Sequence, residues 1–164
     1  MLARLKKMPL ERQLFVSFVS ISSVLLLLTI GIMLYVDIKR QLNSMDQTIR
    51  SSAAYIAQLD GVVDMLERGY PDPEVSQQLD SLSQNMQDLN VIVVYNTSGL
   101  RFYHTDRQQS GETFVEGEEV PILNGSEPYI TTGYGTFGSQ RRAFHAVENH
   151  EGEIIGFVMT SIFT

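Results

Sequence analysis

Residues 14–36 form an apolar run (LFVSFVSISSVLLLLTIGIMLYV) of 23 residues without a charged side chain. As an α-helix with a rise of ~1.5 Å per residue, this run is about 34 Å long, enough to cross a hydrocarbon core of ~30 Å. A cleaved signal peptide has an apolar region of only about 7–15 residues, followed by a small-residue cleavage site. The sequence therefore predicts an uncleaved membrane-spanning helix.

The charges beside this run predict its orientation. Residues 1–13 contain four basic side chains and one acidic side chain. Because basic flanks stay on the cytoplasmic side of a membrane, we expect residues 1–13 in the cytoplasm and residues 14–36 in the plasma (inner) membrane. Residues 37–164 are then a single extracytoplasmic, periplasmic domain.

The domain after the membrane run is acidic. The whole chain has a net charge of −7, and residues 37–164 carry 8 of its 12 basic and 18 of its 19 acidic side chains. This balance argues against binding to nucleic acid, which requires a basic face. The sequence has no cysteine, and its three histidines lack metal-ligand spacing. We therefore expect no metal site and no cofactor.

An amphipathic helix is expected to continue from the membrane run. Its apolar side chains recur in alternating steps of four and three residues, with Ser52 in the one polar position: Ile38, Leu42, Met45, Ile49, Ile56, Leu59, Val63 and Leu66. This spacing is typical of a coiled-coil seam. We expect the seam both to pack on the domain's own sheet and to pair with a second subunit in a homodimer. Residues 69–73 (GYPDP) should end the helix.

The later part of the chain has the pattern of strands. After a second, shorter helix over residues 74–89, runs rich in β-branched and aromatic residues alternate with turn residues. We expect strands at residues 91–95, 100–104, 129–132, 142–148 and 154–162, and a short helix within 118–123. This order predicts an α+β domain in which the long N-terminal helix packs on an antiparallel sheet. Because the chain stops as its last strand completes, we expect a fragment of a longer protein.

Arg101, His104 and Arg142 are the candidate ligand-binding residues. After Lys39 the basic side chains are all arginine or histidine. The planar guanidinium of arginine can meet a carboxylate through two parallel hydrogen bonds. Strand alternation by itself would place Arg101 and His104 on opposite faces, but a twist or bulge at the end of the strand would bring them to one pocket. We expect the three side chains to converge on a small carboxylate.

Neighbouring residues complete the predicted pocket. Thr131, Thr132 and Thr136 can offer hydroxyl groups, of which Thr132 is assigned to the site, and Phe114 and Phe144 are expected to form the walls. Residues 133–138 (GYGTFG) formally fit the dinucleotide fingerprint G-x-G-x-x-G, but a strand follows them instead of a helix, so we reject that interpretation. Hydrolase motifs such as G-x-S-x-G are missing from the sequence.

Several short motifs, in this order and spacing, resemble the extracytoplasmic sensor region of the citrate/C4-dicarboxylate family of sensor histidine kinases. They are Arg101-x-x-His104, Gly111-Glu112-Thr113-Phe114, Gly135-Thr136-Phe137-Gly138 with Arg142-Ala143-Phe144, and Gly152-Glu153-Ile154-Ile155-Gly156-Phe157-Val158. The resemblance is strongest over residues 91–161. It implies a PAS-like (PDC) sensor domain between two membrane helices, with the kinase core beyond residue 164, so that this chain itself catalyses nothing.

The resemblance also implies roles for single residues. Arg101 and His104 would bind one carboxylate, and Arg142 would bind the carboxylate at the other end. Phe114 and Phe144 stand where C4-dicarboxylate sensors have pocket phenylalanines, whereas citrate sensors more often have a cation in place of Phe144, which favours a C4-dicarboxylate. Arg141 replaces the family's usual apolar residue, which leaves open whether it or Arg142 faces the ligand; alternation favours Arg142.

Two other interpretations remain open. The domain can be the sensory part of a chemoreceptor or cyclase that binds another small metabolite. It can also be a non-sensing, membrane-anchored dimerisation module, in which Arg101 and Arg142 only pair with some of the 18 acidic residues that follow the membrane run.

Overall fold

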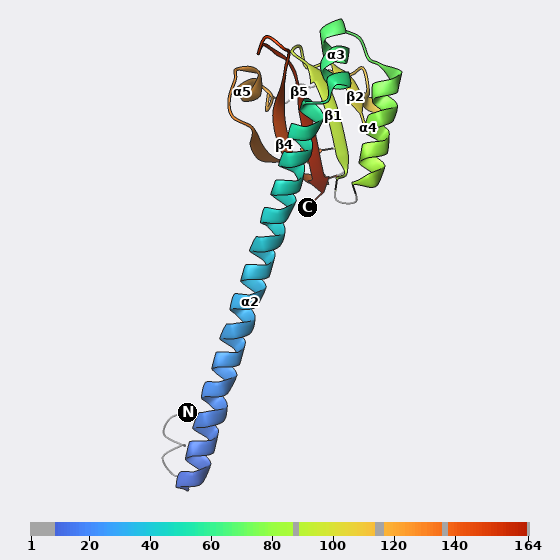
Figure 1. Cartoon of the computed structure of the whole chain (residues 1–164). Helices are drawn as coiled ribbons and strands as arrows, with labels where there is room; N and C mark the ends of the chain where they lie inside the picture. Colours follow the sequence, from blue (N-terminus) through green and yellow to red (C-terminus); the bar gives the residue numbers. More distant parts are fainter. Residues whose placement is uncertain (1–8, 87–88, 114–116, 136–137, 164) are drawn as a thin grey trace. The chain divides into compact units, whose positions relative to one another are not determined.

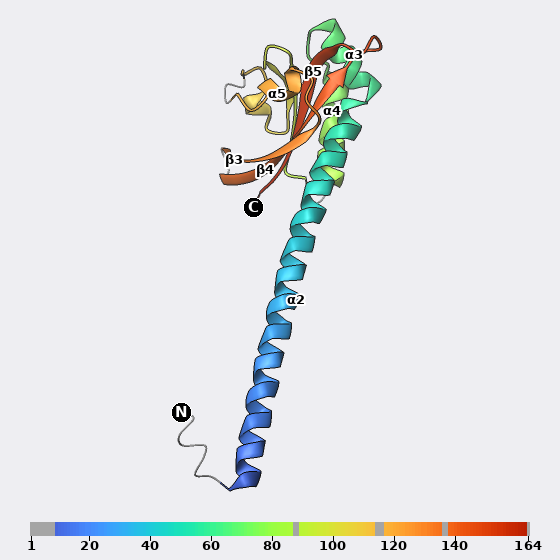
Figure 2. The ribbon, with the colours of Figure 1, turned by 90° about the vertical axis from the view of Figure 1, so that its left-hand side faces the viewer.

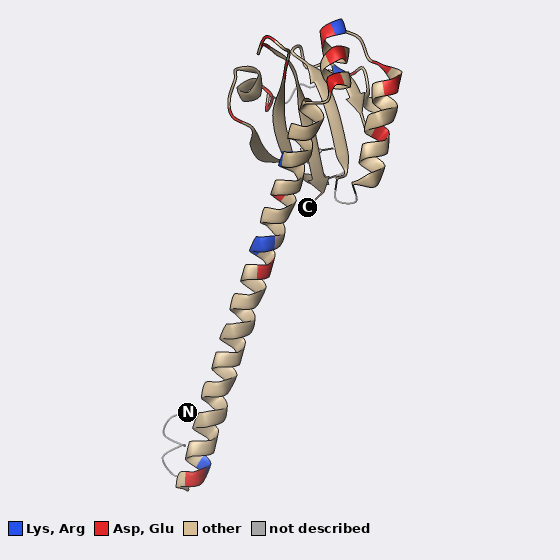
Figure 3. Ribbon diagram, viewed as in Figure 1, with Lys and Arg blue, Asp and Glu red and all other residues tan. Residues whose placement is uncertain are grey.

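The structure is a computed structural model that describes residues 9–86, 89–113, 117–135 and 138–163. The chain divides into two compact units, residues 1–43 and 44–164. Helix α2 (Leu10–Ala57) begins in the first unit, and its apolar part is long enough to cross a membrane, with none of that part buried within the protein. Figure 3 shows this part of α2 without charged residues, which appear only toward its ends.

The second unit is built on a five-stranded antiparallel sheet with the strand order β2-β1-β5-β4-β3. Its strands, labelled in Figure 1 or Figure 2, are β1 (Val91–Asn96), β2 (Arg101–His104), β3 (Tyr129–Gly135), β4 (Gly138–Glu148) and β5 (Ile154–Phe163). All five strands expected from the sequence are present. The central strand is β5, which pairs with β1 on one side and β4 on the other.

Three helical segments precede the sheet: the end of α2, then α3 (Asp60–Arg68) and α4 (Pro73–Asn85). The expectation of one unbroken helix to Leu66 is wrong, because α2 ends at Ala57 and Leu59 has an extended backbone before α3 starts. Gly69 then ends α3 in the left-handed conformation (φ 77°), and its N–H donates to the carbonyls of two residues of the last turn. The helix expected at 74–89 runs only to Asn85.

The sheet has two covered faces, which Figure 2 shows from the side. The α2 face packs against α2, α3 and α4 through a large apolar cluster that includes Ile49, Ile56, Met65 and Leu79. The opposite side, here called the α5 face, is covered in part by the short helix α5 (Val120–Leu123). Its buried apolar side chains are Val91, Val93, Tyr95, Ile122, Phe144, Phe157 and Met159. The long helix therefore packs on the sheet, as expected, and leaves the α5 face to a different set of residues.

A β-bulge decides which side chains of β2 reach each face. Tyr103 pairs with Val94, but Arg101 pairs with Tyr95, so the register shifts by one residue between them. Phe102 and Tyr103 both join the apolar cluster of the α2 face. Arg101 and His104 pair with residues whose side chains lie on the α5 face. The bulge thus brings Arg101 and His104 to the same side of the sheet.

Candidate ligand-binding site

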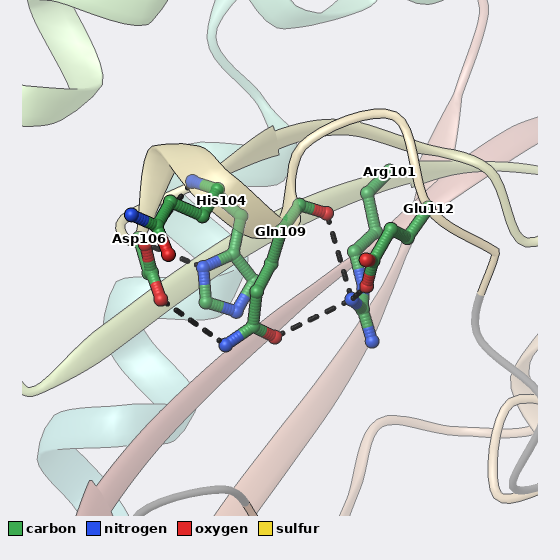
Figure 4. Close-up of polar contacts among 6 residues, drawn as sticks. Arg101, His104, Asp106, Gln109 and Glu112 are labelled. Carbon is green, nitrogen blue, oxygen red and sulfur yellow. Dashed lines mark hydrogen bonds and ion pairs between the residues drawn. The ribbon is translucent and has the colours of Figure 1, made fainter.

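Arg101 lies at one side of the α5 face, surrounded by acceptors (Figure 4). Its Nη1 donates to Glu112 Oε2 at 3.1 Å and to the backbone oxygen and Oε1 of Gln109 at 3.5 and 3.4 Å. The Arg101 side chain is 15% exposed. Its Nε is buried and has no hydrogen-bond partner among the described residues. Arg101 therefore keeps a buried donor for a further acceptor.

His104 lies beside this group and is buried. Its Nδ1 accepts the backbone N–H of Asp106 at 2.8 Å, so the neutral ring carries its hydrogen on Nε2. Burial lowers the pKa of His104, and the positive charge of Arg101 lowers it further. The ring also lines a pocket of about 270 Å³ with Asn90, Val91, Thr105, Asp106 and Phe163. His104 is thus a neutral hydrogen-bond donor beside a cation.

Arg142 lies on β4, on the same face as Arg101 but with two strands between them. Its side chain is 4% exposed, and its Nη1 donates to Glu118 Oε2 at 3.0 Å. Thr131 donates to the same oxygen at 3.3 Å. The guanidinium lies against the backbone of Gly133, where a Cβ would stand 3.0 Å from Nη1. A glycine at this point of β3 makes room for Arg142.

Arg141 lies on the α2 face and binds the helix instead. Its Nε and Nη2 meet the two carboxylate oxygens of Asp46 at 2.5 and 2.7 Å, which raises the pKa of Arg141. Arg142 is therefore the one of the two arginines that shares a face with Arg101. Thr132 pairs with Arg141 in the sheet and accepts a hydrogen bond from it at 3.4 Å. This placement corrects the expectation that Thr132 lines the pocket, because Thr131 is the threonine on the α5 face.

Of the two predicted aromatic wall residues, one lies among the described residues. Phe144 is buried on the α5 face and stacks on Tyr129, with 5.2 Å between ring centroids, so it belongs to the floor of the site. Beside it, Phe157 stacks on Tyr95 at 4.5 Å. Phe114 lies outside the described residues. The floor between the two arginines is therefore apolar and aromatic.

The two halves of the site share a face but are not joined. Arg101 and Arg142 are separated by β1 and β5, three strand spacings of ~4.8 Å or about 14 Å. Each is held by a glutamate from the connection between β2 and β3, Glu112 and Glu118 respectively. Neither glutamate is predicted from the sequence as a contact of these arginines. Among the described residues, no group of three His, Cys, Asp or Glu side chains is arranged to hold a metal ion.

No protein-family model matches this sequence. A segment of 75 residues is 27% identical to the sensor histidine kinase CitA of Klebsiella pneumoniae, and it covers 46% of this chain but only 14% of that kinase. The chain thus corresponds to a small part of the length of the curated relative that it matches.

Solved sensor domains share the fold. The E. coli DcuS sensor domain matches with a TM-score of 0.50 and 20% identity, over 73% of this chain and 92% of that domain. The sensor domain of a Clostridium perfringens histidine kinase gives 0.52 and 23%, over 74% and 96%. That of the V. cholerae histidine kinase DctB gives 0.59 and 13%, over 76% and 54%. Residues 44–164 thus have the fold of histidine kinase sensor domains, which confirms the resemblance noted in the sequence.

Proposed function

We propose that this chain is the extracytoplasmic input region of a membrane sensor histidine kinase, and that its domain binds a small dicarboxylate. The observation that carries the proposal is the bulge in β2. It places Arg101 and His104 on the same face of the sheet as Arg142. A buried guanidinium group (Arg142) and a partly buried one (Arg101) above an apolar floor need an anion as partner.

Each half of the site is suited to one carboxylate. Arg101 offers its buried Nε, and the adjacent His104 offers a neutral ring N–H. Arg142 offers a second guanidinium, with the hydroxyl of Thr131 beside it. Charge-assisted hydrogen bonds of this kind are stronger than neutral ones. We therefore assign one carboxylate of the ligand to Arg101 and His104 and the other to Arg142.

Phe144 favours a dicarboxylate over a tricarboxylate. This position is apolar and packed between Tyr129 and Phe157. A third carboxylate in that part of the site would lose water without gaining a cation, which is costly. A C4-dicarboxylate such as succinate, fumarate or malate is the ligand class that we favour over citrate.

The sheet offers a route for the signal. Strand β5 lies between β1 and β4, so it separates the two halves of the site. A ligand that bridges Arg101 and Arg142 across β5 would bind better to one arrangement of these strands than to another. Such a difference in affinity between two states is what coupling requires. We propose that the signal passes through β5 and through α2 to the membrane, within a homodimer.

A chemoreceptor or another kind of receptor is the second candidate. An extracellular ligand-binding receptor from Desulfohalobium retbaense has a TM-score of 0.59 and 19% identity, with 75% of this chain and 23% of that chain covered. The fold therefore also occurs in a protein described as an extracellular ligand-binding receptor. The ligand pocket proposed here is the same in both cases, and only the output differs.

Thermal unfolding of the 164-residue chain in lipid nanodiscs tests the proposal. Succinate, fumarate, malate and citrate are compared with the uncharged diamide of succinic acid. A ligand at ~100 times its dissociation constant adds about 2.7 kcal/mol to the free energy of unfolding, a readily measured shift. We expect stabilisation by dicarboxylates only, lost in Arg101→Ala and Arg142→Ala.

The matched control is Arg68→Ala. Arg68 is the last residue of α3, and it forms an ion pair with Asp72. This variant should keep the full ligand effect. If no acid stabilises the folded chain, the carboxylate site is refuted and the non-sensing dimerisation module gains support.

A further inference from the structure

Glu112 and Glu118 hold the two arginines that the proposed ligand requires. We propose that these two glutamates are internal competitors of the ligand: each places its carboxylate on an arginine in the ligand-free domain, and a ligand carboxylate must replace it. This inference rests on the proposed function, because it concerns the same site. It adds two residues that set ligand affinity.

The pair at β4 shows the match in chemistry. Glu118 Oε2 lies 3.0 Å from Arg142 Nη1 and also accepts the hydroxyl of Thr131. These are the donors that the carboxylate of a ligand would use. The Arg142 side chain is 4% exposed and Glu118 is 25% exposed, so the cation is buried while its partner reaches it from the rim.

The pair at β2 repeats the arrangement. Glu112 Oε2 lies 3.1 Å from Arg101 Nη1, with side-chain exposures of 64% for Glu112 and 15% for Arg101. Gln109 adds two neutral acceptors to the same nitrogen, at 3.4 and 3.5 Å. Here too the buried cation belongs to the sheet and the acceptors come from the connection that follows β2. The protein's own groups thus occupy both halves of the site.

The geometry of these pairs makes them replaceable. Each glutamate reaches its arginine through one oxygen, Oε2. On the opposite face, Arg141 and Asp46 are joined through two nitrogens and two oxygens. The pair of Glu112, which is 64% exposed, contributes little to stability because solvent screens it, whereas Glu118 is 25% exposed and is screened less. A ligand that makes the two-bond contact therefore has an advantage over either glutamate.

Competition of this kind also selects the ligand. A dicarboxylate can replace both glutamates and leave neither guanidinium without an anion. A monocarboxylate replaces only one of them, and an uncharged analogue replaces neither. The two glutamates thus favour ligands with two negative charges. They also lower the affinity of the domain for every ligand.

Calorimetric titration of the nanodisc-embedded chain with succinate tests this inference. We expect Glu118→Gln to bind succinate about fivefold more tightly than the unsubstituted chain, and Glu112→Gln about twofold more tightly, because Glu112 is the more exposed partner. Glutamine keeps the size of the side chain but removes the charge that faces Arg142, so the melting temperature without ligand should fall in Glu118→Gln and hardly change in Glu112→Gln, whose acid is 64% exposed.

The matched control is Glu127→Gln, in the same connection, where the side chain is exposed and makes no ion pair among the described residues. It removes one negative charge and so measures the general effect of charge, which should stay below twofold. If Glu118→Gln binds no more tightly than Glu127→Gln, or binds more weakly, the competition is refuted while the site stands. If the unsubstituted chain and all three variants fail to bind any dicarboxylate, the proposed function itself is refuted.

Discussion

Arg141 and Arg142 are neighbours in the chain, yet they face opposite sides of the sheet. Arg141 binds Asp46 on α2, whereas Arg142 is buried on the α5 face beside Glu118. Alternation along a strand separates them, and each arginine has a different partner on its side of the sheet. Arg141 joins α2 to β4, and Arg142 is the arginine that we propose binds the ligand.

His104 makes a pH dependence testable at the scale of one residue. Its folded-state pKa is lowered by burial and by Arg101, so it lies below the unfolded-state value of ~6.5. The neutral ring therefore stabilises the fold above pH ~6.5, and this contribution is lost as the pH falls through that value toward the folded-state pKa.

We expect the chain without ligand to lose stability as the pH falls below ~6.5. In His104→Gln that loss should be smaller, because glutamine does not titrate. Urea unfolding at a series of pH values measures both. Equal pH slopes in the two proteins would contradict the assignment of His104 as a buried, neutral ring.

At the scale of elements, β5 is the central strand of the sheet. It pairs with β1 and β4, and its Thr160 donates to the backbone oxygen of Ile49 in α2 at 2.7 Å. Gly156 stands where β5 passes closest to its neighbours. A Cβ there would overlap the carbonyl oxygen of Tyr95 and approach Leu66 Cδ1 to 2.9 Å.

Gly156→Ala should therefore lower the free energy of unfolding by about 2–3 kcal/mol, because the backbone of β1 must move to admit the methyl group. Gly133→Ala is the matched control, since its added Cβ would meet only the end of the Arg142 side chain, which can shift. Chemical denaturation of both variants gives the comparison. A loss in Gly133→Ala as large as that in Gly156→Ala would show that the contact with β1 is not the cause.

At the scale of the whole molecule, α2 combines an apolar segment with a segment that packs on the sheet. One helix of the described chain is long and apolar enough to cross a membrane. The basic residues before it predict that the N-terminus lies in the cytoplasm and residues 37–164 outside it. This orientation is a proposal that can be tested on the intact chain.

Because the sequence contains no cysteine, single cysteines can report the orientation. We expect Ser126→Cys to react with a membrane-impermeant maleimide in intact spheroplasts. Ala3→Cys should react only after the membrane is opened. The reverse pattern of labelling would place the sensor domain in the cytoplasm and exclude an extracytoplasmic ligand.

Much of this protein follows from local pattern. The uncharged run at residues 14–36 predicts a membrane helix because lipid admits only helices and closed barrels. The five strands follow from β-branched runs between turns, and the separation of Arg141 from Arg142 follows from alternation. These features depend on residues close in sequence, so the sequence alone is enough to predict them.

Contacts between distant segments decided the rest. The break between α2 and α3, the placement of Thr131 instead of Thr132 on the α5 face, and the pairing of Arg101 and Arg142 with Glu112 and Glu118 all appear only in the folded chain. The sequence allowed a bulge in β2 without requiring one. The register of β2 on β1 in the folded chain decides that the bulge forms, because strand register depends on how whole faces pack and not on the residues of one strand.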